Sequence, residues 1–230
     1  RAARLPGDLL FGPERLREIE PYARGVKALH VPSAGIVDYA AVAEMFAEVI
    51  RNRGGTIQTS ARVARFLRRD AGWVLETTAG DIRAKYLIAC GGLHADRLTI
   101  MAGGPSDVRV MPFRGEYYDV IPQRRSLVKS MIYPVPNPAV PFLGVHFTRT
   151  ISGCVHAGPN AVLALKREGY RKRDVSCSDL LGMLTFPGFW KMAGTYWSVG
   201  LEELYRSMSK GAFVQALQRL VPDVTAEDLV

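Results

Sequence analysis

Hydrophobic positions recur at helical spacing in the first quarter of the chain. Asp38 is a residue type that often caps helix starts, and Gly54 with Gly55 ends the pattern. Between them the apolar residues fall at i, i+3, i+4, i+7 and i+8: Val42, Met45, Phe46, Val49 and Ile50. The pattern predicts an amphipathic helix that packs on one side.

The pattern then changes to β segments separated by glycine turns. Residues 56–90 predict a short strand from Thr56 and three further β segments, the last returning as the apolar strand Tyr86–Cys90. Residues 108–120 are strand-like around Pro112 and Gly115, and a Pro-rich passage leads to another apolar strand over residues 141–149. A helix followed by a strand and a meander is typical of an α/β arrangement.

Residues 144–159 predict a β-hairpin that contains two histidines. If its loop is centred at Ile151 or Ser152, His146 and His156 face the same side of the sheet, directly or diagonally opposite each other. A loop centred between the two positions would put them on opposite faces. The register of this hairpin therefore decides whether the histidines can act together.

Two glycines, Gly144 and Gly158, would flank these histidines and leave a gap in the layer of side chains, as in a pocket floor. Histidine suits proton removal from a hydroxyl because its ordinary pKa lies near neutrality. The alternative is a hydrogen-bonded core histidine. Asn160, near the end of the strand, offers a donor and an acceptor to a carboxylate or carbonyl.

The last third of the chain predicts helices up to Pro222. Two apolar faces support this: Leu201, Leu204, Tyr205 and Met208 form one, and Phe213, Leu217 and Leu220 form the other. The final TAEDLV has the form of a helix start, which indicates a further element.

Composition is that of an ordinary globular protein, with 48% hydrophobic and 23% charged residues among 230. The net charge of +8 suits nucleic acid, an anionic membrane surface, or an anionic cofactor and substrate. The basic clusters at residues 62–69 and 166–173 lack interleaved aromatics, so solvated faces are favoured and no nucleic acid is expected. No apolar stretch reaches the roughly 20 residues that span a bilayer. The N-terminus lacks Met and a signal-peptide core, so we expect a piece of a longer protein.

The three cysteines, Cys90, Cys154 and Cys177, have no CxxC spacing. This favours neither a disulfide framework nor a zinc site, and we expect no metal and a reducing compartment. Gly91 and Gly92 directly follow the predicted return strand, where missing side chains would let the backbone approach a phosphate or sugar. A plain strand-ending turn is the alternative. The 230 residues contain no G-x-G-x-x-G, P-loop, HExxH or GxSxG motif.

The order of segments nevertheless resembles a known family. The segments that carry the resemblance are GIVDYAAVAEMFAEVIRNRGG, the ARV strand, YLIACGGLHAD, MPFRGEYY, YPVPNPAVPFLGVHFTR and HAGPNAVLAL. They are similar to consecutive parts of the FAD-dependent L-2-hydroxyglutarate dehydrogenase/oxidase family, within the D-amino-acid-oxidase-like flavoproteins. LGVHFTR and HAGPNAVLAL are specific to the hydroxyglutarate branch. The family's N-terminal dinucleotide fingerprint and its C-terminal segment that closes over the flavin are not among these residues, so this chain alone is expected to be inactive.

The resemblance implies roles for individual residues. Val63 would meet the adenine of FAD through its backbone, although a core valine explains the position almost as well. Gly91 and Gly92 would form the turn near the ribose and pyrophosphate. Arg114 could attract a substrate carboxylate or the charge that develops on the flavin, or it could pair with Glu116 as scaffold. His146 would take the proton of the substrate hydroxyl.

The resemblance implies an α/β flavoenzyme of two domains. Residues 1–105 would form part of the FAD-binding domain, and residues 106–230 a substrate domain with a mixed or antiparallel sheet and covering helices. The enzyme would oxidise L-2-hydroxyglutarate to 2-oxoglutarate and pass electrons to oxygen or a quinone chain. We expect a cytoplasmic location, mitochondrial in a eukaryote, with peripheral membrane contact as an additional expectation. The alternatives are a relative that acts on another 2-hydroxy acid, an amino acid or glycerol 3-phosphate, and a non-catalytic basic binding module.

Overall fold

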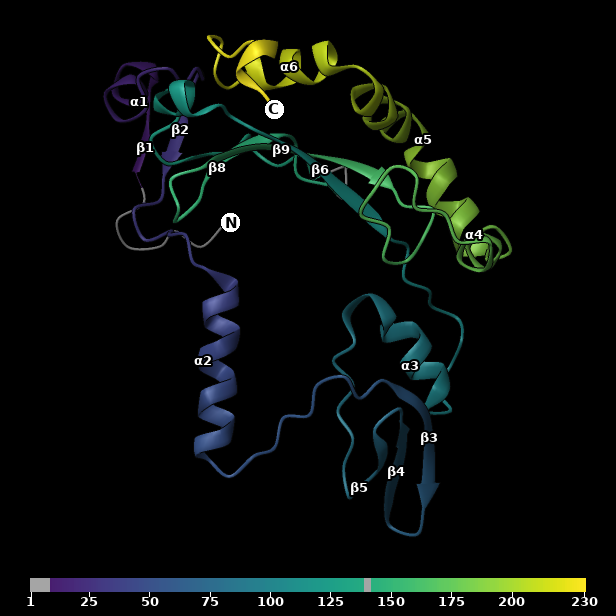
Figure 1. Ribbon diagram of the computed structural model, residues 1–230. Helices are drawn as coiled ribbons and strands as arrows, with labels where there is room; N and C mark the ends of the chain where they lie inside the picture. The colour runs from purple at the N-terminus through teal and green to yellow at the C-terminus, as the bar shows by residue number, and fades with distance from the viewer. Residues whose placement is uncertain (1–8, 139–141) are drawn as a thin grey trace. The chain divides into compact units, whose positions relative to one another are not determined.

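The computed structural model describes residues 9–138 and 142–230, which form two compact units (Figure 1). Unit 1 comprises residues 1–38, 113–163 and 193–230, and Unit 2 comprises residues 39–112 and 164–192. The sequence predictions that fall on residues 1–8 and 139–141 lie outside the described residues. Each unit mixes helices with antiparallel strands, so the predicted mixed α/β class is confirmed.

Unit 1 is built on a four-stranded antiparallel sheet with the strand order β6-β9-β8-β7. Its strands are β6 (Phe113–Asp119), β7 (Met131–Ile132), β8 (His146–Arg149) and β9 (Val155–Leu163). The strand predicted over residues 141–149 is therefore shorter, beginning at His146. A separate two-stranded sheet pairs β1 (Leu9–Phe11) with β2 (Ala28–His30), and α1 (Pro13–Ile19) lies between them in the chain.

The core of Unit 1 lies between one face of the large sheet and the C-terminal helices. Phe147 and Ala157 of the sheet are buried together with Phe213 and Leu217 of α6 (Lys210–Gln218), which runs over the sheet in Figure 1. The long helix α5 (Pro187–Met208) precedes α6 and is kinked at Tyr196. The predicted helical third is thus confirmed, although the apolar face that includes Leu201 and Tyr205 is exposed.

The helix start predicted near the C-terminus is present, and a capping box forms it. Thr225 and Asp228 bond each other's backbone N–H groups at the start of the short 3-10 helix η3 (Ala226–Asp228). The helix does not continue, because Leu229 then pairs with Val120 next to β6 and is buried in the core.

Unit 2 contains α2 (Tyr39–Asn52) and the three-stranded meander β3 (Val63–Arg69), β4 (Gly72–Thr77) and β5 (Gly80–Ala84). It also contains α3 (Ala95–Met101), α4 (Cys177–Leu184) and the first residues of α5. The predicted helix is confirmed, and β3, β4 and β5 correspond to the three predicted β segments, the last of them only in its first half. The apolar side of α2 is exposed, however, so the expectation that this helix packs on one side is not met within the described residues.

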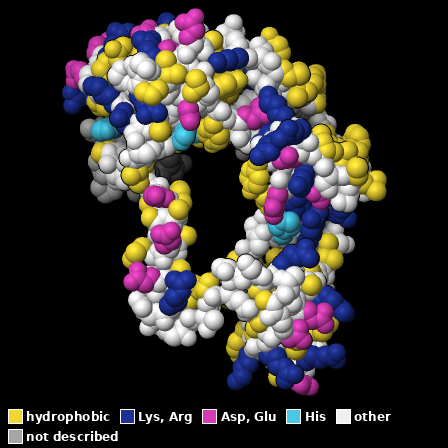
Figure 2. All heavy atoms as spheres, viewed as in Figure 1, with side chains coloured by type: hydrophobic (Ala, Val, Ile, Leu, Met, Phe, Trp, Pro, Cys, Tyr) yellow, Lys and Arg dark blue, Asp and Glu magenta, His cyan; other side chains and the backbone are white. Residues whose placement is uncertain are grey.

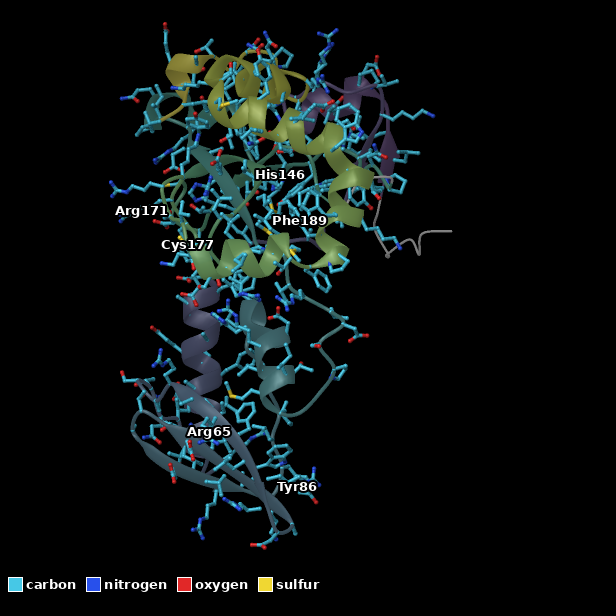
Figure 3. The ribbon with its side chains drawn as sticks, turned by 90° about the vertical axis from the view of Figure 1, so that its right-hand side faces the viewer. Arg65, Tyr86, His146, Arg171, Cys177 and Phe189 are labelled. Atoms are coloured by element: carbon cyan, nitrogen blue, oxygen red, sulfur yellow. The ribbon has the colours of Figure 1, made fainter. Side chains whose placement is uncertain are left out.

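Two predicted strands of Unit 2 are wrong. The segment from Thr56 is not a strand, and neither is the return strand Tyr86–Cys90. A strand requires a neighbour to pair its backbone groups, and no strand of the described chain lies next to Tyr86–Cys90. The Tyr86 side chain is instead 87% exposed and lies on the outside of Unit 2 (Figure 3).

Candidate active site

The hairpin of β8 and β9 brings the two predicted histidines to one face of the Unit 1 sheet. His146 lies opposite Gly158, and Thr148 lies opposite His156, so the loop is centred at Ser152. Because His146 and Thr148 are two residues apart on one strand, they share a face. The two histidines are therefore diagonal neighbours on that face, as one of the two predicted loop positions requires. We call this side of the sheet the histidine face.

His146 is 8% exposed and lies within Unit 1 (Figure 3). Its Nδ1 lies 3.0 Å from the carbonyl oxygen of Gly144, and since a carbonyl can only accept, Nδ1 carries the proton. The Nε2 lone pair is thus left as the proton acceptor. Burial lowers the pKa of His146 from its ordinary value, and the bond to Gly144 opposes this only in part. A neutral imidazole that can accept a proton is the result.

His156 occupies a different environment on the same face. Its Nδ1 is hydrogen-bonded to the carboxylate of Asp119, the last residue of β6, so its ring orientation is set by that acid. The ring also meets the edge of Tyr117 at a centroid distance of 6.4 Å. Asp119 faces the same side because it pairs directly with His156 in the register of β6 and β9.

The two glycines predicted to leave a gap beside the histidines, Gly144 and Gly158, differ in what a side chain at each position would meet. Gly158 has a φ of +146°, and a Cβ there would lie 2.8 Å from the Glu116 carbonyl oxygen and from a Tyr117 ring carbon. Any side chain at Gly158 would therefore push β6 and β9 apart. Gly144 precedes β8, and a Cβ there would meet Pro134 at 3.3 Å, so Pro134 already occupies its side.

Arg114 and Asn160 contact the helical side of the sheet. Arg114 donates to Glu116 at 2.7 Å, and its side chain is 10% exposed, so the ion pair weighed as the alternative is present. Asn160 is fully buried: its amide nitrogen donates to the Glu203 carbonyl oxygen of α5 at 2.7 Å, and its amide oxygen accepts from Arg206 at 3.2 Å. The structure does not bring Arg114 or Asn160 together with His146 on the histidine face.

The predicted cofactor residues lie in Unit 2. Val63 begins β3 opposite Thr77, next to an irregularity in the register. Gly91 and Gly92 lead into the short 3-10 helix η1 (Gly92–His94). A Cβ on Gly91 would meet Leu98 of α3 at 2.3 Å, whereas Gly92 has a φ of +50° and open space where a side chain would be. Gly92 therefore has a backbone conformation that favours glycine, whereas a side chain at Gly91 would require only the flexible end of Leu98 to shift.

Sequence reasoning missed Tyr133 and Asp119 of the histidine face. Tyr133 follows β7 and stacks on His146, and its hydroxyl lies 3.1 Å from the Thr148 hydroxyl. Asp119 could have been found from the alternation along β6, where it lies two residues after Tyr117. The Pro-rich passage that contains Tyr133 has no strand alternation from which its place on the histidine face could have been predicted.

Neither a membrane helix nor a metal cluster is found in the described ranges. No helix in residues 9–138 and 142–230 has the length and apolar character to cross a bilayer. Within the same residues, no three His, Cys, Asp or Glu side chains come together as metal ligands.

Comparison with known proteins identifies the class first. The family described as FAD dependent oxidoreductase matches residues 1–217, so the chain belongs to the FAD dependent oxidoreductase family. Structures of 17–18% sequence identity share its fold. L-alpha-glycerophosphate oxidase from Mycoplasma pneumoniae has a TM-score of 0.70 over all of this chain and 52% of its own, and L-proline dehydrogenase from P. horikoshii has 0.57 over 80% of this chain and 49% of its own.

More similar relatives are L-2-hydroxyglutarate dehydrogenases. The one from Indibacter alkaliphilus is 48% identical over 94% of this chain and 55% of its own length. The one from Escherichia coli strain K12 is 43% identical over 94% of this chain and 51% of its own length. The mitochondrial one from Homo sapiens is 40% identical over 98% of this chain and 51% of its own length. The chain thus spans about half the length of the curated relatives it matches.

Proposed function

We propose that this chain is part of an enzyme that uses FAD to oxidise L-2-hydroxyglutarate to 2-oxoglutarate. Relatives that are 40–48% identical over nearly the whole chain are L-2-hydroxyglutarate dehydrogenases from bacteria and animals, which supports this substrate. The proposal concerns the whole protein, because the chain spans about half of those relatives. We assign Unit 2 to FAD binding and Unit 1 to the substrate side, so residues 164–192 would go with FAD binding despite the boundary expected at residue 105.

The turn at Gly91 and Gly92 fits a role in holding FAD. The open space beside Gly92 is what a close backbone contact with a phosphate or ribose requires. Val63, at the start of β3, remains the predicted backbone neighbour of the adenine. When bound, the flavin supplies an acceptor for the hydride of the substrate carbon.

The neutral imidazole of His146 is the single observation that carries the mechanism. Oxidation of a secondary alcohol releases a hydride from carbon and a proton from the hydroxyl. Nε2 of His146 would take that proton, because Nδ1 is held by the Gly144 carbonyl and burial keeps the ring uncharged near neutral pH. His156 gives its Nδ1 proton to the Asp119 carboxylate, so its Nε2 would accept a hydrogen bond from a substrate hydroxyl.

The substrate carboxylates require donors that this chain supplies only in part. Arg114 and Asn160 stay predictions for this role, and their contacts with Glu116 and Glu203 support a scaffold role instead.

Oxygen or a quinone chain is proposed as the electron acceptor, with peripheral membrane contact in the second case. Free thiols at Cys90, Cys154 and Cys177 support a reducing location, in the cytoplasm or, in a eukaryote, the mitochondrion.

Turnover of a form of the protein that spans the length of its relatives tests this proposal. It would be assayed with a redox dye against L-2-hydroxyglutarate, D-2-hydroxyglutarate, L-lactate, glycerol 3-phosphate and glycine. We expect kcat/KM to be highest for L-2-hydroxyglutarate. A higher value for another compound would assign the protein to a different branch of the same family.

A non-catalytic basic binding module is the weaker candidate. Figure 2 shows Lys and Arg side chains interspersed with Asp and Glu on the visible face. In the cluster at residues 62–69, Arg65 lies 3.6 Å from Glu76 and Arg68 lies over the Trp73 ring. A steep fall in nucleic-acid affinity with rising salt would favour the binding module.

A further inference from the structure

Unit 2 contains a cavity of about 170 Å³ between α3, α4 and the segments at residues 109–112 and 164–167. Apolar side chains form part of its wall: Ile100, Val110, Met111, Leu165 and Met183. Three arginines line it as well: Arg97, Arg109 and Arg167. Pockets that enclose drug-sized ligands measure roughly 300–1,000 Å³, so this cavity suits a smaller molecule.

Two of the three arginines are neutralised by aspartates of the cavity wall. Arg167 donates to both carboxylate oxygens of Asp96, at 2.6 Å and 3.0 Å, and its side chain is 11% exposed, so this member of the second basic cluster is largely shielded from solvent. Arg97 pairs with Asp179. These two pairs leave no net charge of their own on the wall.

Both acids are held in their charged form. Burial works to raise the pKa of Asp96, but the Arg167 side chain and the backbone N–H groups of Val110 and Arg97 outweigh it, so the pKa is lowered. The pKa of Asp179 is lowered by the backbone N–H of Arg167, against burial, with a further contribution from Arg97. Fixed negative charges in the wall disfavour a multiply charged anion.

Arg109 is the arginine of the cavity wall whose positive charge the two aspartates do not balance. Its Nη1 donates to the Gly182 carbonyl of α4 at 3.0 Å, and its guanidinium lies 5.5 Å from the centre of the Phe186 ring. In the described parts of the chain it has no carboxylate partner. A guanidinium has five N–H donors, so most of those of Arg109 remain available in a side chain that Gly182 and Phe186 already orient.

We propose that this cavity binds a small organic monocarboxylate. The carboxylate lies on Arg109, and its short apolar body lies against Met111, Leu165 and Met183. The net charge of the wall is +1, from three arginines and two aspartates, which matches a monoanion. This inference does not rest on the proposed oxidation of L-2-hydroxyglutarate, because every residue involved belongs to the cavity of Unit 2.

Butanoate is the probe, and the 230-residue chain is the protein. Saturation-transfer NMR and calorimetry compare butanoate with butan-1-ol, which has the same apolar body without the charge, and with inorganic phosphate. We expect saturable binding of butanoate, weaker binding of butan-1-ol and no competition by phosphate. Arg109→Gln should raise the Kd for butanoate about tenfold or more, as expected for the loss of a charge-assisted bond.

Two further variants complete the test. Arg83→Gln removes an exposed arginine of β5 outside this cavity and should leave the Kd unchanged. Ile100→Trp keeps Arg109 but places an indole into the cavity, and should abolish binding even if Arg109→Gln folds poorly. The absence of saturable butanoate binding by the unmodified chain would overturn the proposal. So would an unchanged Kd in Arg109→Gln or an equal loss in Arg83→Gln.

Discussion

The imidazole of His146 stacks on the phenol ring of Tyr133, with ring centroids 4.1 Å apart and planes inclined by 25°. Tyr133 is fixed in turn by the contact of its hydroxyl with Thr148, a residue of the same strand as His146. The stack buries one face of the imidazole, and the Gly144 carbonyl holds its Nδ1. His146 is therefore oriented from two sides, as a group that accepts a proton at Nε2 would need to be.

Replacing His146 tests whether this orientation serves catalysis. In a form of the protein that spans the length of its relatives, His146→Ala should keep FAD and fold but lose turnover by about a hundredfold or more, because general base catalysis contributes that much. The measurement is kcat per bound flavin. His156→Ala changes a histidine one strand away on the same face, and it should lower kcat per bound flavin less than His146→Ala does. Unchanged turnover per flavin with a lower melting temperature would make His146 a core histidine.

The lowered pKa of His146 predicts how stability depends on pH. Burial lowers this pKa below the unfolded value of 6.5, so between the two values the unfolded chain binds a proton that the folded chain does not. The stability of the wild type relative to His146→Gln should fall as pH drops below about 6.5, by up to about 1.4 kcal/mol per pH unit. Denaturant unfolding at pH 7.5 and 5.5 measures this. A difference that stays constant over this range would mean that the pKa is not lowered.

A side chain at Gly91 should require the end of the Leu98 side chain to move. A Cβ at Gly91 would lie 2.3 Å from a terminal methyl of Leu98, so Gly91→Ala should lower the free energy of unfolding by about 1 kcal/mol, the lower end of overpacking costs, because this methyl ends a flexible side chain. In a Leu98→Ala background the same change should cost much less. Guanidinium unfolding of the four variants gives the coupling energy. If the two changes are simply additive, the cost of a side chain at Gly91 does not come from contact with Leu98.

Asn160 should act on stability through α5. It is fully buried, and its amide bonds the Glu203 carbonyl and the Arg206 side chain. Asn160→Ala should destabilise the protein by about 1–3 kcal/mol, because the partners lose their bonds in a buried place. Gln215→Ala, which removes an exposed amide on α6, is the control and should change stability by about 0.5 kcal/mol or less. If Asn160→Ala unfolds like the wild type, the contact with α5 contributes little.

Local patterns allowed much of the fold to be predicted. The spacing of apolar residues is enough to place α2, and the separation of His146 from His156 limits the hairpin to a few registers. The histidine face could be predicted only in part, because its other members come from distant segments. Asp119 reaches His156 across 37 residues, through the pairing of β6 with β9.

A prediction made from a single residue could not tell whether its side chain binds a ligand or contacts another side chain of the protein. The sequence around Arg114 fits equally a ligand for an anion or a partner of Glu116. The alternation along β6 puts the two side chains on one face, where they form an ion pair. The return strand Tyr86–Cys90 failed for a related reason, because an apolar run forms a strand only where another strand pairs with it.

The visible spectrum of a form that spans the length of its relatives tests the central claim most directly. We predict a yellow protein with the two absorption bands of an oxidised flavin. Anaerobic addition of L-2-hydroxyglutarate should bleach these bands, and D-2-hydroxyglutarate should leave them in place. A colourless protein, or flavin bands that L-2-hydroxyglutarate does not bleach, would contradict the proposed function.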